Sequence, residues 1–291
     1  MVAPAFDYVA AGGYDEAVRL LAERGDEAKI LAGGQSLMPM LNLRLARPGL
    51  LIDINPADQR PPSLNKGVLR LPALTRHRVL LEHDLVRRGC PLLADAVRHV
   101  GNVRVRNRGT IGGSLAHADP TSEIGCCALA VGAEVVARGP GGDRTVPAGD
   151  LFAGYWATTL AESEVITDVL IPAARRRQGW SFLEMVRRTS DFAIVAVAAV
   201  VDLAERSAAI AAARVALAGV ADRVVLADPE LVGLAGSTAD EDLDAAAARI
   251  AGSLEPADDV HASGAYRCRL ARVLTARALR EARDRAAGAV P

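Results

Sequence analysis

Two glycine pairs in nearly the same local context most constrain what this chain can fold into. Residues 31–37 read LAGGQSL, and residues 109–115 read GTIGGSL. Adjacent glycines indicate a place where a large group approaches the backbone. Backbone N–H groups in a tight turn before a helix bind phosphate well, and a dinucleotide carries a pyrophosphate. We therefore expect both pairs to hold one dinucleotide, although spacing alone leaves a structural turn open at each.

Other motifs for phosphate binding or catalysis are missing from the sequence. It has no G-x-G-x-x-G and no G-x-x-x-x-G-K-[ST], so neither the ordinary Rossmann fingerprint nor a P-loop is present. It has no G-x-S-x-G, so neither Ser36 nor Ser114 resembles a hydrolase nucleophile. His117, Asp119 and Glu123 carry metal-ligand chemistry, but no second histidine accompanies them. The sequence therefore predicts no metal site and no hydrolase nucleophile on this chain.

Composition excludes several classes of function. The 34 basic and 35 acidic residues nearly balance, which argues against a nucleic-acid-binding surface. The four cysteines form no C-x-x-C pair, so we expect buried reduced thiols and no iron–sulfur or zinc site. The longest apolar run, about 193–201, is too short to span a membrane. The first residues show no secretory pattern, so we expect a cytoplasmic protein.

Hydrophobic periodicity predicts three units. In 1–55, the spacing predicts a helix over 14–24 and strands at 29–32 and 50–54. A second helix is expected to begin at Ser36, with Pro39 as its third residue. We describe this unit as a βαββ-type arrangement. A stretch rich in Pro, Asn and Asp (54–67) precedes the second unit, 56–175. That unit mixes strands and helices, and we expect 101–120 to be rich in loops.

The third unit, 176–291, follows the basic run 173–179. Strands are expected in WSFLEMVRR and ARVALAGV, and FAIVAVAAVVDL fits either a strand or a buried helix. The last 50 or so residues are strongly helical in pattern. The predicted fold class is α+β.

Four segments together carry a resemblance to a known family. They are AGGQSLMPMLNLRLARP (32–48), RNRGTIGGSLAHADPTSE (106–123), EVITDVLIP (164–172) and SGAYRCRLARVLTARAL (263–279). Together they closely resemble the FAD-binding medium subunit of the molybdenum hydroxylases, the xanthine dehydrogenase and carbon monoxide dehydrogenase relatives. The resemblance implies a two-subdomain FAD-binding unit of the PCMH (vanillyl-alcohol-oxidase-like) type. A C-terminal α+β domain of the carbon monoxide dehydrogenase flavoprotein type would follow it.

The resemblance also implies which residues contact FAD. The family's positions correspond here to Leu31, Ala32, Gly33, Gly34, Gln35, Ser36, Leu37, Thr110, Ile111, Gly112, Gly113, Ser114, Glu123, Ile166 and Phe192. Phe192 stands where the family often has Tyr, and Glu184 stands about where it commonly has Lys. A charge change at Glu184 would shift the flavin potential if that side chain lies near the ring. A solvated Glu184 and a Phe192 that is simply part of the core are the alternatives.

The function that the resemblance implies is distributed over a complex. A large partner subunit would hydroxylate substrate at a molybdenum cofactor, and a small partner subunit would carry two [2Fe–2S] clusters. FAD on this chain would take the electrons and pass them to an external acceptor, in a dimer of heterotrimers. Gln35 and Ser114 favour an N-heterocycle or related organic substrate over carbon monoxide. A carbon monoxide dehydrogenase subunit, a self-contained flavin oxidase and a scaffold subunit that has lost FAD are the alternatives.

Overall fold

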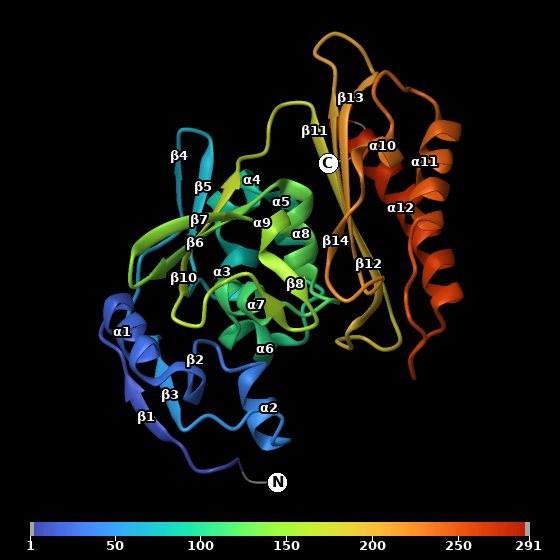
Figure 1. The fold of residues 1–291 in the computed structure, drawn as a ribbon. Coiled ribbons are helices and arrows are strands. Elements are labelled where there is room, and N and C mark those ends of the chain that lie inside the picture. The colour runs from blue at the N-terminus through green and yellow to red at the C-terminus, as the bar shows by residue number, and fades with distance from the viewer. Residues whose placement is uncertain (1–2, 289–291) are drawn as a thin grey trace.

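A computed structural model of the chain describes residues 3–288, and three larger β-sheets organise it (Figure 1). The first sheet is parallel, in the order β1-β3-β2, from β1 (Asp7–Ala10), β2 (Ala28–Leu31) and β3 (Leu50–Asp53). Helix α1 (Tyr14–Arg24), followed by the short η1 (Gly25–Glu27), joins β1 to β2, and α2 (Leu37–Asn42) joins β2 to β3. The unit is therefore βαβαβ, with the helix expected after Ser36 lying between its last two strands, so the shorter label βαββ is corrected to βαβαβ.

Helix α1 covers the first sheet with the side chains that the sequence predicted. Tyr14, Ala17, Val18 and Leu21 are buried, as their spacing along one helical face requires. They pack with Leu50 and Ile52 of β3 in one apolar cluster. Because the strands are parallel, their carboxyl ends and the residues that follow them share one edge of the sheet. The first glycine pair lies at this edge.

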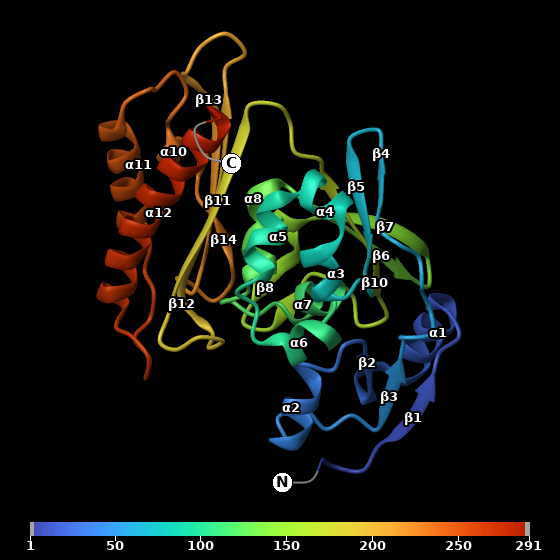
Figure 2. The same ribbon diagram turned by 180° about the vertical axis from the view of Figure 1, so that it is seen from behind.

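The second sheet has the order β4-β5-β10-β6-β7, and all of its pairings are antiparallel. Its strands are β4 (Ser63–Asn65), β5 (Val68–Pro72), β6 (Glu134–Gly139), β7 (Gly142–Pro147) and β10 (Val165–Pro172). Six helices lie between β5 and β6 in the chain and cover one face of this sheet (Figures 1 and 2): α3 (His77–Glu82), α4 (Asp84–Gly89), α5 (Pro91–Val97), α6 (Val103–Arg108), α7 (Ile111–His117) and α8 (Glu123–Val131). After β7 come α9 (Ala148–Leu151) and the hairpin of β8 (Phe152–Gly154) and β9 (Ala157–Thr158).

The stretch 101–120 is helical, so the expectation of a loop-rich segment is wrong. Two capping side chains explain the difference. Asn102 accepts hydrogen bonds from the N–H groups of Arg104 and Val105 and begins α6. Thr110 accepts one from the N–H of Gly113 and begins α7. The second glycine pair therefore lies in the first turn of a helix and not in a tight loop.

The third sheet separates two helical layers. It runs in the order β11-β12-β13-β14, from β11 (Gln178–Val186), β12 (Ala193–Leu203), β13 (Ile210–Ala218) and β14 (Val225–Leu226). Helices α5 and α8 pack on the face toward the second sheet, and α12 (Gly264–Ala286) packs on the other face. Helix α11 (Asp240–Gly252) lies beside α12. The short helix α10 (Pro229–Val232) precedes α11 in the chain. The ambiguous segment FAIVAVAAVVDL is strand β12, buried on both faces between these layers.

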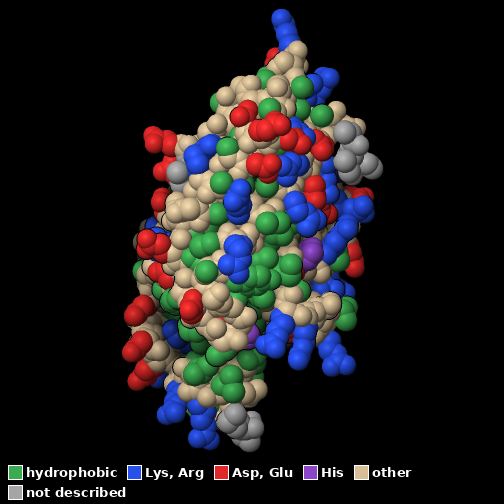
Figure 3. All heavy atoms as spheres, turned by 90° about the vertical axis from the view of Figure 1, so that its right-hand side faces the viewer, with side chains coloured by type: hydrophobic (Ala, Val, Ile, Leu, Met, Phe, Trp, Pro, Cys, Tyr) green, Lys and Arg blue, Asp and Glu red, His purple; other side chains and the backbone are tan. Residues whose placement is uncertain are grey.

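The outer surface over α11 and α12 mixes apolar and charged side chains (Figure 3). Tyr266 and Val273 of α12 are among its exposed hydrophobic residues. No helix among residues 3–288 is both long and apolar enough to cross a membrane. Each of the three sheets lies within one of the three units expected from the sequence, and the unit limits at 55 and 175 stay predictions.

Candidate functional site

The two glycine motifs, far apart in the chain, lie against each other. A Cβ placed on Gly33 would come within 2.8 Å of the Cα of Gly109 and would overlap the carbonyl oxygen of Arg108. A Cβ placed on Gly113 would lie 3.9 Å from the Cβ of Ala32. Only a residue without a side chain permits this approach at Gly33. The loop between β2 and α2 and the junction of α6 with α7 therefore form one continuous surface.

The first motif presents a row of unused hydrogen-bond donors. Among the described residues, none accepts a hydrogen bond from the backbone N–H groups of residues 33–37. Gly34 has a φ of +72°, which turns successive N–H groups toward one side. Ser36 makes no capping hydrogen bond to α2, so its expected role as a helix cap is wrong. Consecutive donors of this kind form a cradle for an anion.

The second motif has already used its N–H groups. Ile111 donates to the carbonyl oxygen of Thr75 at 3.1 Å, and Gly112 donates to that of Ala73 at 2.9 Å. The N–H of Gly113 is taken by Thr110 at 3.1 Å. The expected second set of free donors is therefore absent, because these bonds attach the start of α7 to the segment after β5. What the motif offers a ligand is a side-chain-free surface and the hydroxyl of Ser114.

The hydroxyl of Ser114 is held by a buried histidine. Its Oγ lies 3.1 Å from Nε2 of His77. Burial lowers the pKa of His77 to about 4, so the ring is neutral near pH 7. Its Nδ1 is buried and meets no partner among residues 3–288. A neutral ring pairs with the hydroxyl without adding charge and fixes the position of Ser114 on α7.

A polar bridge that the sequence did not predict joins the two motifs. Asn55, just after β3, donates from Nδ2 to the carbonyl oxygen of Ala32 at 2.8 Å. Arg76 donates to Oδ1 of Asn55 and to the carbonyl oxygen of Arg108. Burial lowers the pKa of Arg76. The only signal in the sequence was that Asn55 follows a strand at the sheet edge where Gly33 also lies.

Glu123, at the start of α8, lies within electrostatic range of Glu184 in β11. Oε1 of Glu184 lies 3.1 Å from Nδ1 of His99, and this contact raises the pKa of His99. The side chain of Glu184 is only 6% exposed, so a solvated Glu184 is excluded. Burial raises the pKa of Glu123 to about 7, and the nearby charge of Glu184 adds to the shift. The carboxyl groups of Glu123 and Glu184 are therefore both buried.

Other predicted residues lie in different surroundings. Ile166 of β10 is 4% exposed and packs in the main apolar core, where Ile111 also lies. Phe192, in the hairpin that leads into β12, is 77% exposed, so it is not part of the core. Leu31 and Leu37 are half-buried at the two ends of the first motif.

No metal site is apparent in the described part of the chain. No group of three or more His, Cys, Asp or Glu side chains among residues 3–288 could hold an ion. Burial lowers the pKa of His117, which lies at the end of α7. Cys90, Cys126 and Cys127 are buried, as expected, whereas Cys268 is partly exposed.

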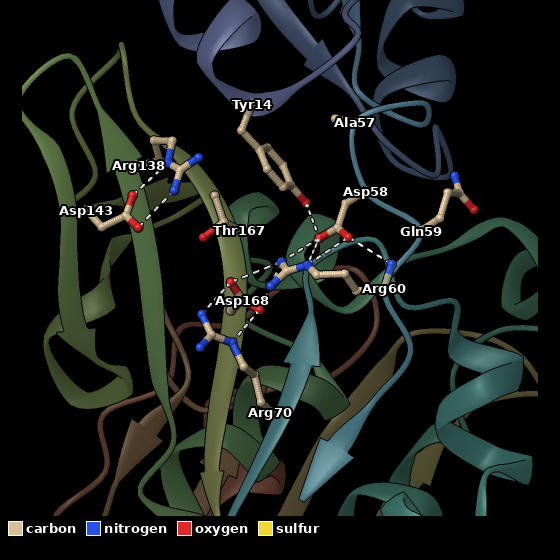
Figure 4. Close-up of a pocket in the computed structure, with 10 residues that line it drawn as sticks. All are labelled: Tyr14, Ala57, Asp58, Gln59, Arg60, Arg70, Arg138, Asp143, Thr167 and Asp168. Carbon is tan, nitrogen blue, oxygen red and sulfur yellow. Dashed lines mark hydrogen bonds and ion pairs between the residues drawn. The ribbon is translucent and has the colours of Figure 1, made fainter. Parts of the chain in front are cut away.

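A separate cavity of about 640 Å³ lies between α1, β5 and β10 (Figure 4). Asp168 accepts hydrogen bonds from Arg60 and Arg70, and Asp58 accepts from Arg60. The side chains of both aspartates are only 3% exposed. No residue of either glycine motif lines this cavity, and its charges are matched among themselves. We therefore regard this cavity as an ion-paired contact between the first two sheets and not as the dinucleotide site.

Comparison with known families covers nearly the whole chain. Residues 4–174 match the model described as the FAD binding domain in molybdopterin dehydrogenase. Residues 180–282 match the CO dehydrogenase flavoprotein C-terminal domain.

Individual relatives are similar over their full length. The alpha subunit of the 6-hydroxypseudooxynicotine dehydrogenase complex of Paenarthrobacter nicotinovorans is 37% identical, over 98% of this chain and 97% of the relative. A solved carbon monoxide dehydrogenase from Hydrogenophaga pseudoflava, which lacks the Mo-pyranopterin moiety of its cofactor, is 37% identical with a TM-score of 0.93, covering 97% and 98% of the two chains. Quinoline 2-oxidoreductase from Pseudomonas putida 86 is 34% identical with a TM-score of 0.91, covering 99% of each. These matches confirm the expected fold class, an FAD-binding unit followed by a C-terminal α+β domain.

Proposed function

Because the chain belongs to the family of FAD-binding subunits of molybdopterin dehydrogenases, we propose that it is the FAD-carrying electron-transfer subunit of a molybdenum-containing hydroxylase or dehydrogenase. Its relatives are dehydrogenases and oxidoreductases, so the chain is an oxidoreductase subunit. The observation that carries the proposal is the row of free N–H groups at 33–37, directly beside the second glycine motif.

The residues present fit a pyrophosphate. The cradle offers donors without any cationic side chain in the loop itself, and the glycine at 33 leaves the surface open. We propose that residues 33–37 bind the pyrophosphate and that Ser114, positioned by His77, binds from the side of α7. Leu31, Ala32, Thr110, Ile111, Gly112, Gly113, Glu123, Ile166 and Phe192 are proposed as the remaining members of the FAD site.

Each group of residues has a separate task in this proposal. Bound FAD would supply a centre that takes up electrons and releases them to an external acceptor. Arg76 and Asn55 hold the two motifs at a fixed distance, so the cradle is formed before the cofactor arrives. In its ionised form, Glu123 at the start of α8 would lower the electron affinity of a nearby flavin, whereas Glu184 is paired with His99.

We further propose that the chain works inside a complex. One relative is named as a subunit of a dehydrogenase complex, which supports partner subunits here. A large subunit with the molybdenum cofactor and a small subunit with two [2Fe–2S] clusters would complete a heterotrimer, two of which would pair. The three domains would be 1–55, 56–175 and 176–291, with FAD between the first two.

The substrate is proposed to be an N-heterocycle or a related organic compound. The names of two relatives, a quinoline oxidoreductase and a dehydrogenase of a hydroxylated nicotine derivative, support that class. A carbon monoxide dehydrogenase is equally similar in sequence, so carbon monoxide is the second candidate.

One experiment tests the function. The tagged chain would be purified from its source cells, and its visible spectrum and molybdenum and iron contents would be measured. We expect FAD, molybdenum, iron and two further polypeptides, and we expect quinoline or carbon monoxide, added without oxygen, to bleach the spectrum. In the complex carrying Gly33→Ala, cluster absorbance should still bleach, while transfer to an external dye should fall in step with the FAD content. A lone flavoprotein that oxidises a substrate by itself would contradict the proposal.

A further inference from the structure

A second cavity, of about 500 Å³, lies between the second and third sheets. Its walls come from the ends of α4 and α8, the start of α5, the connection 172–178 and one face of the third sheet. Most of the lining is apolar, including Leu92, Val131, Pro172 and Val200. The volume and the apolar walls are those of a site for a small organic molecule.

Three side chains cross the sheet side by side and form one wall. Trp180 of β11 is directly opposite Val200 of β12, and Val200 is directly opposite Arg214 of β13. Directly paired residues point to the same face of a sheet. The indole of Trp180, the methyl groups of Val200 and the guanidinium of Arg214 therefore form one row. The indole N–H of Trp180 donates to Asp95 at 2.9 Å, and Arg285 stacks on the ring with its Cζ 5.4 Å from the centroid. The indole is therefore held in place at the cavity wall.

Arg214 is a charged side chain of this cavity wall that has no ion-pair partner among the described residues. It makes no hydrogen bond and no ion pair with the described residues, and burial lowers its pKa. The carboxylate that influences its pKa is Asp202, whose two oxygens are bonded to Gln178 and Arg175 at 2.9 Å each. The guanidinium lies beside Gly132 at the end of α8, where no carbonyl oxygen accepts from it. A half-buried guanidinium without a protein partner can bind an anionic ligand through charge-assisted hydrogen bonds.

We propose that this cavity binds a small carboxylate with an aromatic or branched apolar body, whose carboxylate meets Arg214 and whose body lies against Trp180 and Val200. A guanidinium binds a carboxylate through two parallel hydrogen bonds, which a neutral analogue cannot reproduce. None of the residues proposed to hold FAD lines the cavity, so the site is distinct and the inference does not depend on the proposed function.

The test uses Trp180 as a built-in reporter. The chain has two tryptophans, and the other, Trp156, is 62% exposed in the β8–β9 hairpin. In a Trp156→Phe background without FAD, Trp180 is the only source of tryptophan emission. Benzoate would be titrated against this emission, with benzamide as the uncharged probe of the same shape. We expect saturable quenching by benzoate and roughly tenfold or more weaker binding of benzamide.

Two variants and one further sample complete the test. Arg214→Met should weaken benzoate binding by roughly tenfold or more, while Arg206→Met, which changes an exposed arginine in the β12–β13 turn, should not change it. The purified complex should bind benzoate as the isolated chain does. The proposal is overturned if benzoate and benzamide bind alike, if Arg214→Met binds as well as the parent, or if the complex blocks the site, since a partner would then cover the pocket.

Discussion

Gly33 lies against Gly109, so that a Cβ on Gly33 would come within 2.8 Å of the Cα of Gly109. The contact joins two motifs that are far apart in the chain, and the N–H groups of residues 33–37 have no acceptors among the described residues. Any atom added at Gly33 must push the two segments apart. The geometry of the proposed FAD cradle therefore depends on this contact as well as on the bridge through Asn55 and Arg76.

Gly33→Ala should weaken FAD binding by about tenfold or more, because an inserted methyl in a filled site typically costs about 1–3 kcal/mol. FAD bound per chain and its dissociation constant would be measured by absorbance and fluorescence titration. Gly252→Ala is the matched control, because a Cβ there meets nothing within 4 Å. Normal FAD affinity in a folded Gly33→Ala chain would show that the cradle lies elsewhere.

Arg76→Gln should also lower FAD affinity, by about tenfold, because it breaks the bridge from Asn55 to the carbonyl oxygen of Arg108. The chain should remain folded, since the change lies outside the apolar clusters. Arg78→Gln, two residues along the chain and exposed, should bind FAD normally. Equal affinities in the two variants would remove the positioning role of Arg76. Circular dichroism of both chains provides the folding control.

The buried His77 and Glu123 should give opposite pH dependences of stability. The folded pKa of His77, about 4, lies below its ordinary 6.5, so the unfolded chain binds more protons and His77 favours folding as pH rises from about 4 to 6.5. The folded pKa of Glu123, about 7, lies above its ordinary 4.5, so its contribution to stability is lost as pH rises from about 4.5 to 7. Each effect amounts to about 3 kcal/mol at most.

Urea unfolding of the FAD-free chain from pH 4.5 to 7.5 would measure both effects. Relative to wild type, Glu123→Gln should become steadily more stable as pH rises. His77→Gln should become steadily less stable relative to wild type over the same range. Parallel curves for either variant and wild type would mean that the group has an ordinary pKa in the folded protein.

The ion-paired contact between the first two sheets, shown in Figure 4, should contribute to the free energy of unfolding but not to FAD binding. Asp168→Asn leaves Arg60 and Arg70 without their shared carboxylate, and we expect a loss of about 2 kcal/mol in the free energy of unfolding, discounted because both arginines are about half exposed. Asp143→Asn breaks a more exposed pair with Arg138 and should cost less than about 1 kcal/mol. Both variants should keep full FAD affinity. Weak FAD binding by folded Asp168→Asn would instead assign the cofactor to this cavity.

The sequence predicted the parts of the fold that depend on local pattern. Helix α1 and its four buried side chains follow from spacing alone, and α12 follows from a long helical pattern. Strand β12 was ambiguous because it is buried on both faces and so shows no alternation. Helix α7 was missed because its glycine pair resembles a turn, whereas the cap from Thr110 decides the conformation.

The site could be predicted only in outline. The glycine motifs pointed to a cofactor, but which of their N–H groups are free depends on partners such as Ala73 and Thr75, which are distant in the chain. Arg76 and Asn55 meet only because the first two sheets pack together. Arg214 has no carboxylate partner among the described residues, and Asp202, the carboxylate that influences its pKa, is bonded to Gln178 and Arg175. Such relationships arise from tertiary packing, which no periodicity records.

The most direct measurement follows the backbone amides of a ¹⁵N-labelled chain while FAD is added. We expect the amide resonances of residues 33–37 to move together and to saturate at one FAD per chain, because their N–H groups have no acceptor in the described structure. Those of Ile111 and Gly112, already bonded to Thr75 and Ala73, should move less. If the resonances of 33–37 stay in place while those of Tyr14, Thr167 and Asp168 move, FAD lies in the charged cavity and the central claim is wrong.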